Sequence, residues 1–221
     1  MKIFKFFNNK KIKLFITLFL LLCLYIFINA FTYVTTISND LQKNVFRLHI
    51  IANSNSQKDQ NLKYIVRDNI IEYMKTICYS CNSKEEAIKQ VSNHLDDFTK
   101  IANQTILENG FSYNAKVSIG NFDFPTKTYG DISFPSGYYD ALKIQLGNAD
   151  GENWWCVLYP SLCFIDVSSG IVPDDSKETL QENLSEEDYK ILSSNDTTIN
   201  LKFKLIEFFT QNNIITAKSS S

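Results

Sequence analysis

The sequence has 221 residues, of which 44% are hydrophobic and 21% charged, and its formal net charge is −2. The composition, with only seven Gly and four Pro, excludes the collagen-like, low-complexity and wholly disordered classes of protein. Five lysines and no acidic residue open the chain, at Lys2, Lys5, Lys10, Lys11 and Lys13. The rest carries 17 basic and 24 acidic residues, a net charge of −7, so we expect no nucleic-acid partner.

An apolar run, LFITLFLLLCLYIFI at residues 14–28, follows these lysines. This order is typical of a secretory signal peptide or a signal anchor, and the positive-inside rule places the chain after it outside the cytoplasm. The run is short for a membrane span, and Ile28 is a poor −3 residue for cleavage after Ala30, so both alternatives stay open. We predict four regions: a signal peptide or anchor over 1–30, a linker over 31–43, a single exported domain over 44–213 and a flexible tail over 214–221.

The first half of the exported domain predicts a strand followed by helices. Residues 45–52 are β-branched and apolar, as in a strand, and the turn Asn53 to Ser56 follows. Ser56 begins a helix whose apolar residues recur every three or four positions until about Cys78. Ser83 and Glu86 form a capping box, and the spacing after it predicts one helix ending at Asn109-Gly110.

The second half changes to a period of two. Alternation or β-rich composition predicts strands at 113–119, 142–146, 154–159 and 162–165, joined by short turns and therefore antiparallel. Residues 124–137 and 167–183 are expected to be loops, Ser185 with Asp188 to cap a short helix, and residues 200–211 to form a terminal helix. The order of elements predicts an α+β fold, with helices packed on a small, mainly antiparallel sheet.

Catalytic and metal-binding signals are scarce. The chain has only two His, His49 and His94, and no motif of a hydrolase, a zinc protease or a nucleotide-binding loop. Cys78 and Cys81 form one C-x-x-C, which lacks the further ligands of a zinc site and does not open a helix after a strand, as redox pairs do. We predict no metal, no cofactor and no catalytic residue. Cys156 and Cys163 flank a turn and are candidates for a disulfide, with two buried thiols as the alternative.

Polar and aromatic residues cluster around the first strand and the later loop. Arg47 and His49 are two apart and share one strand face. Asp59, Lys63 and Arg67 are four apart, a spacing typical of a solvated charged face. Trp154 and Trp155 must point to opposite faces of their strand. As a hypothesis, one partner-binding surface combines these residues: Arg47, His49, Asn53, Asp59, Lys63, Arg67, Tyr129, Gly130, Trp154 and Trp155.

Two blocks of the sequence carry a family resemblance. RLHIIANSNSQKDQNLKYIVRD at residues 47–68 and FPTKTYGDISFPSGYYDALKIQLGNADGENWWCVLYPSLCF at residues 124–164 resemble the stage II sporulation protein R family. The resemblance implies a signalling protein made in the forespore and exported into the space between the forespore and mother-cell membranes. It further implies a partner there, a membrane-embedded aspartic protease of the mother cell, which then removes the pro-sequence of the early mother-cell sigma factor.

The resemblance implies no catalytic residues, so we expect an activator and not an enzyme. Two other classes fit the same export signal. A cell-wall-binding or cell-wall-hydrolysing protein could stack sugars on the aromatic loop, although a hydrolase needs a carboxylate pair that we cannot assign. A thiol oxidoreductase would use Cys78 and Cys81.

Overall fold

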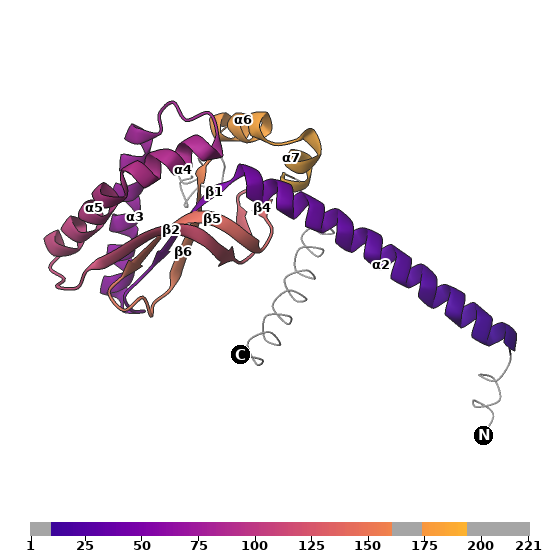
Figure 1. Ribbon diagram of the computed structural model, residues 1–221. Helices are drawn as coiled ribbons and strands as arrows, with labels where there is room; N and C mark the ends of the chain where they lie inside the picture. The colour runs from indigo at the N-terminus through magenta and orange to yellow at the C-terminus, as the bar shows by residue number, and fades with distance from the viewer. Residues whose placement is uncertain (1–9, 161–173, 194–221) are drawn as a thin grey trace, which may run out of the picture. The chain divides into compact units, whose positions relative to one another are not determined.

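A computed structural model describes residues 10–160 and 174–193 (Figure 1). The chain divides into two compact units, Met1–Ile37 and Ser38–Ser221, which are taken separately. Helix α2 (Lys10–Asn44) begins in the first unit, and its stretch Lys10–Asn29 is long and apolar enough to cross a membrane. An N-terminal signal sequence passes the same test, so this helix is compatible with a signal peptide or an anchor.

The segment expected to be a linker, residues 31–43, is helical. It contains neither Gly nor Pro, so nothing in it interrupts α2 before Asn44. Within the second unit, Leu41 is fully buried, and the carbonyl of Gln42 accepts a 2.6 Å hydrogen bond from Lys84. The last turn of α2 therefore belongs to the folded domain.

A four-stranded sheet forms the centre of the second unit. Its strands are β1 (Phe46–Ile51), β2 (Ala115–Phe124), β5 (Gly137–Leu146) and β6 (Asn153–Tyr159). They lie in the order β2-β5-β1-β6, with β1 parallel to β5 and the other two pairs antiparallel. This sheet and the helices around it confirm the predicted fold class.

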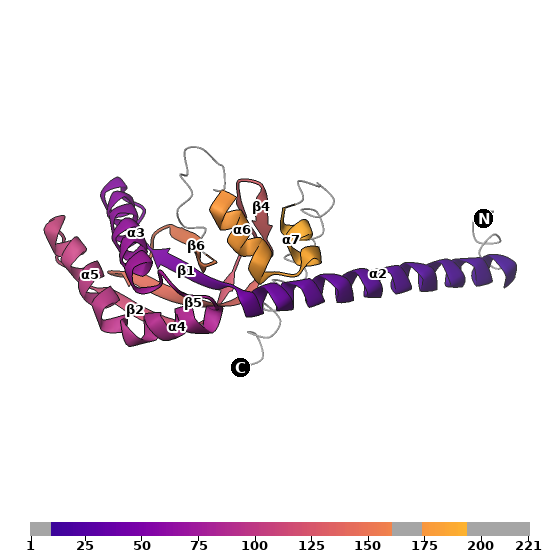
Figure 2. The ribbon, with the colours of Figure 1, turned by 90° about the horizontal axis from the view of Figure 1, so that it is seen from above.

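Helices α3 (Gln57–Ile77), α4 (Lys84–Asn93) and α5 (Leu95–Glu108) cover one face of the sheet (Figure 2). Leu48 and Ile50 of β1 point into this layer and are fully buried beside Leu62 and Val66 of α3. The helices begin where the capping signals place them: the Ser56 hydroxyl accepts the backbone N–H of Asp59 at 3.2 Å. Apolar burial at helical spacing therefore builds the core on this side.

Shorter elements lie beside the sheet. The hairpin β3 (Lys127–Tyr129) and β4 (Ile132–Phe134) occupies the segment expected to be a loop. Helices α6 (Asp174–Asn183) and α7 (Glu186–Leu192) follow later in the chain. Lys177 of α6 pairs with Asp131 of the hairpin turn at 2.8 Å, and α7 contacts β4. Gly130 has a φ of +58° in that turn, which glycine adopts without strain.

Three further expectations differ from the structure or fall outside it. The long helix expected after Ser83 is two helices, because the chain bends at His94, which ends α4 and precedes α5. Residues 174–183, expected as loop, form α6, whereas the short helix after Ser185 is confirmed as α7. The expected strand 162–165, terminal helix 200–211 and tail 214–221 lie outside the described residues.

The strands on either side of the Gly147–Asn153 turn are not hydrogen-bonded to each other. Strand β1 lies between β5 and β6, so these two run in opposite directions without forming a ladder. The turn therefore has to cross the end of β1, next to the point where β1 leads into α3. This crossing is the structural basis of the polar cluster described below.

Candidate functional site

Arg47 lies on the face of β1 that points away from α3 and is fully buried. Three aromatic rings surround its guanidinium carbon, those of Phe124, Tyr139 and Phe134, at 4.2, 4.8 and 5.7 Å from the ring centroids. Its Nη2 donates to the Tyr129 hydroxyl at 2.9 Å, and that hydroxyl donates to the Trp155 carbonyl at 3.0 Å. Its Nη1 has no hydrogen-bond partner among the described residues. Ring faces and neutral oxygens balance the charge of Arg47. Among the described residues, no carboxylate pairs with it.

His49 lies two residues further along the same face, as the strand spacing predicts. Its ring stacks on Trp155 with 3.6 Å between centroids, and its Nε2 donates to Asn153 Oδ1 at 2.7 Å. Its Nδ1 has no partner within the described residues. Burial lowers the pKa of His49 to about 4, with Lys143 and Arg47 acting in the same direction and Asn153 opposing them. The imidazole of His49 is therefore neutral at pH 7. This favours a structural role, because a general base has a pKa near neutrality.

Asp59 is the centre of a second cluster, at the start of α3. It is 6% exposed, and four side chains donate to its carboxylate: Ser54, Asn53 and Ser56 to Oδ2 and Tyr113 to Oδ1. The Tyr113 bond is 2.6 Å long. Burial alone would raise the pKa of Asp59, but these hydrogen bonds outweigh it and lower the pKa below its ordinary value. Asp59 thus holds the turn between β1 and α3 in place.

The same turn is fastened to the turn between β5 and β6. Asn53 Oδ1 accepts the backbone N–H of Asn148 at 2.9 Å, and Gly151 N–H donates to the Ala52 carbonyl at 2.9 Å. A Cβ at Gly151 would collide with the Ser54 carbonyl, so the two turns approach too closely for any other residue there. The two turns, NSN and GNADGEN, lie one in each of the two sequence blocks that carry the family resemblance.

Lys63, expected on a solvated helix face, is buried at 1% exposure. Its ammonium donates to Gln60 Oε1 at 2.6 Å and to the Glu152 carbonyl at 3.2 Å. Burial lowers the pKa of Lys63, Arg67 adds to this effect, and Glu152 opposes it. The predicted solvated charge ladder is therefore wrong, because α3 turns this side toward the β5–β6 turn.

Arg67 packs on an aromatic pair at the helix side of β6. Its guanidinium carbon lies 4.4 Å from the Trp154 ring centroid and 5.1 Å from that of Tyr64, and its Nη2 pairs with Asp68 at 2.7 Å. Trp154 thus faces α3, whereas Trp155 faces His49 on the opposite side. The prediction that the two indoles point to opposite faces is confirmed.

The ten residues expected to form one surface are divided between two faces of the sheet. Arg47, His49, Tyr129 and Trp155 lie on one side. Lys63, Arg67 and Trp154 lie on the other, with Asn53 and Asp59 at the end of β1. Gly130 is in the hairpin turn next to Tyr129. These ten residues therefore do not form one continuous surface, because the apolar pair Leu48 and Ile50 draws α3 to the sheet face without Arg47 and His49.

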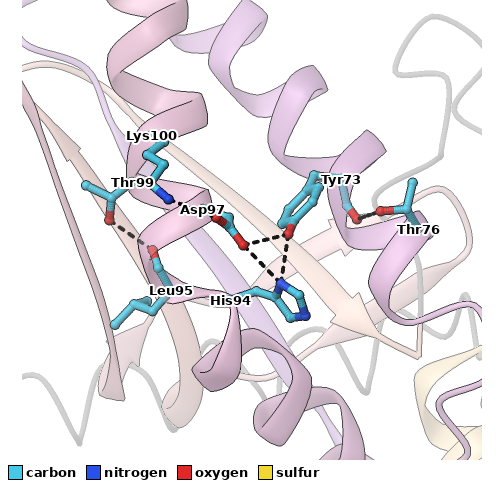
Figure 3. A network of polar contacts seen from close by, with 7 residues as sticks. All are labelled: Tyr73, Thr76, His94, Leu95, Asp97, Thr99 and Lys100. Atoms are coloured by element: carbon cyan, nitrogen blue, oxygen red, sulfur yellow. Dashed lines mark hydrogen bonds and ion pairs between the residues drawn. The ribbon is translucent and has the colours of Figure 1, made fainter.

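A third polar cluster joins the helices at the bend (Figure 3). The Tyr73 hydroxyl lies 2.8 Å from His94 Nδ1 and 3.0 Å from Asp97 Oδ2, and the latter two atoms are 3.1 Å apart. Lys100 adds an exposed ion pair to Asp97 at 3.3 Å. Through these contacts the His94 ring ties α3 to the α4–α5 junction. The i, i+3 spacing of His94 and Asp97 at a helix start was the available signal.

The described cysteines of the second unit lie in two places. Cys78 and Cys81 form a disulfide at the end of α3, packed against the core. Cys156 is disulfide-bonded and buried, and its expected partner Cys163 lies outside the described residues. In the part of the chain that the structure describes, no group of three or more His, Cys, Asp or Glu is placed to hold a metal ion.

Replacing Asp59 by Asn should lower the free energy of unfolding by about 2 kcal/mol at pH 7, because a buried charge-assisted acceptor is lost. Urea denaturation measures this change. The deficit should shrink as the pH falls below about 4, where the unfolded chain protonates its aspartates and the lowered pKa of Asp59 no longer favours folding. The exposed Asp68, replaced by Asn, is the control and should cost under about 1 kcal/mol. An Asp59→Asn variant as stable as its parent would contradict the prediction.

These features define a class: an α+β domain that follows an apolar helix and uses its buried polar residues for internal contacts. A family model described as stage II sporulation protein R matches residues 42–169, which is more than half of the chain. The chain belongs to this family of sporulation proteins.

One curated relative is the stage II sporulation protein R of Bacillus subtilis (strain 168). It is 43% identical over 124 residues, which cover 56% of this chain and 55% of the relative. The chain thus matches about half the length of this relative. No solved structure matches the chain.

Proposed function

We propose that this chain is an exported signalling protein of sporulation that activates a membrane-embedded aspartic protease of the mother cell. The protease in turn processes the precursor of the early mother-cell sigma factor. The family match over residues 42–169 carries this proposal, and that range includes the paired turns and the buried contacts of Arg47. The lysine-rich start and the helix Lys10–Asn29 support export across the forespore membrane, by a cleaved signal or with the helix as an anchor.

We further propose that the chain acts by binding and is not itself an enzyme. The polar residues that chemistry would need are engaged inside the fold: Asp59 accepts four side-chain donors, and His49 stacks under Trp155 in a neutral state. A wall hydrolase requires two carboxylates that face the same substrate. Asp59, closed in by its donors, does not offer one.

Reconstitution tests the proposed activity. The full chain is added to membranes that contain the candidate protease and its sigma-factor precursor, and precursor cleavage is followed by gel. We expect cleavage that depends on the added chain and that disappears when the catalytic Asp of the protease is replaced by Asn. Cleavage that persists with the inactive protease would assign the peptidase activity to this chain and overturn the proposal.

Replacing Cys78 and Cys81 together by Ser should leave processing within about twofold of the parent. Their disulfide closes a very short loop, so we expect a loss of stability of up to about 2 kcal/mol, seen as a lower melting temperature. Cys23→Ser, outside the folded domain, is the control. A double variant that is folded and exported but fails to trigger processing would support a thiol oxidoreductase instead.

A further inference from the structure

The face of the sheet opposite α3, α4 and α5 is buried at one end and exposed to solvent at the other. Around Arg47 it is covered, since Phe124 and Tyr139 are fully buried there. Toward the β5–β6 turn it opens, and two rows of side chains cross all four strands. The rows follow from the strand register: Ser118, Lys143, His49 and Trp155, then Lys116, Gln145, Ile51 and Asn153. Except for the buried His49, these residues are half-buried or exposed, and we call them the Trp155 face.

The Trp155 face is cationic within an acidic protein. Lys116 is exposed and Lys143 half-buried, and neither forms an ion pair with the described residues. Lys143 instead lies 4.9 Å from the ring centroid of Phe122. The four strands have two acidic residues, Asp123 and Asp140, and strand alternation places both on the other face of the sheet. Asp140 pairs there with Lys84 at 2.7 Å. Two lysines without a neighbouring acid are complementary to a negative partner.

A rigid aromatic platform lies between the two lysines and the strand edge. Trp155 is half-buried and is held from below by the His49 ring at 3.6 Å and by Phe124 at 4.7 Å. His49 Nδ1 and Arg47 Nη1, on this side of the same strand, both lack a hydrogen-bond partner within the described residues. A preorganised, partly open Trp that shares a sheet face with two lysines has the composition of an interface hot spot.

We propose that the Trp155 face binds an acidic segment of the mother-cell protease on the outer side of its membrane. Carboxylates of that segment meet Lys116 and Lys143, and an apolar side chain covers Trp155. This inference rests on the proposed function and names the part of the chain that performs it. It also assigns recognition to one side of the sheet, away from Arg67 and Trp154.

The test combines Lys116→Glu with Lys143→Glu in the full chain. The matched control combines Lys58→Glu with Lys89→Glu, two exposed helix lysines away from this face with the same change in charge. Half-maximal precursor processing should need at least about tenfold more of the Trp155-face variant, whereas the control should stay within about twofold. Should Lys143→Glu lower the melting temperature, the exposed Lys116→Glu alone should still raise the half-maximal concentration about threefold.

Charge reversal in the protease completes the experiment. Acidic residues in its outer segments are replaced by Lys one at a time, and at least one replacement should restore processing by the double variant. Absence of any restoration, full activity of the double variant, or an equal loss in the control would overturn the inference. An equal loss would indicate general attraction to an anionic membrane surface. Failure of the unaltered chain to trigger processing is a separate result, because it refutes the proposed function before any variant is compared.

Discussion

The Arg47→Lys variant should lose about 3 kcal/mol of unfolding free energy, although the substitution keeps the charge. An ammonium group cannot form the planar contacts that the guanidinium makes with three rings, and it loses the 2.9 Å bond to Tyr129. It would also remain buried, where an unpaired charge is costly. Chemical denaturation of the parent and variant measures the difference.

Because the Arg47 contacts are internal, processing of the precursor should fall in step with stability. Arg67→Lys is the matched control: that guanidinium packs on Trp154 and pairs with Asp68 near the surface, and we expect a loss of under about 1 kcal/mol. An Arg47→Lys variant with the parent's melting temperature but no activating ability would place Arg47 at the receptor instead.

Local sequence signals predicted the elements better than their boundaries. The serines at 56 and 83 begin helices because their hydroxyls accept backbone N–H groups, an interaction contained within four residues. Apolar spacing continues across the bend at His94, from Val91 to Leu95 and Phe98, so the spacing does not indicate the bend. The sequence of helix α6, DDSKETLQEN, has no helical apolar pattern, because its single apolar residue is Leu180, which is fully buried.

The arrangement of the candidate site depended on contacts distant in the sequence. Strand parity predicted that Arg47 and His49 share a face and that the two indoles separate. Strand alternation does not predict that β1 lies between β5 and β6, because strand order depends on pairings between residues roughly a hundred positions apart. The signal for the covered face was nevertheless present: Leu48 and Ile50 form the apolar side of β1, which an amphipathic helix buries.

Acidification should destabilise the domain in a window set by His49. Its pKa is about 4 in the folded chain, chiefly through burial, against about 6.5 in an unfolded one. Between these values the unfolded chain binds a proton that the folded chain excludes, so stability rises with pH across the window and is lost as the pH falls through it. From pH 7 to pH 4 the loss from this residue should be about 3 kcal/mol. The carboxylates with lowered pKa values, Asp59, Asp97 and Asp140, act below this window.

Urea denaturation at a series of pH values measures this slope, and His49→Gln should flatten it between about pH 6.5 and 4. Two neighbours supply controls of opposite sign. Asn153 raises the pKa of His49, so Asn153→Ala should lower that pKa further and extend the slope to lower pH. Lys143 lowers the pKa of His49, so Lys143→Gln should make the slope shallower. An unchanged slope in His49→Gln would show that other groups carry the acid sensitivity, and opposite responses of the two neighbour variants would place it at the His49–Trp155 stack.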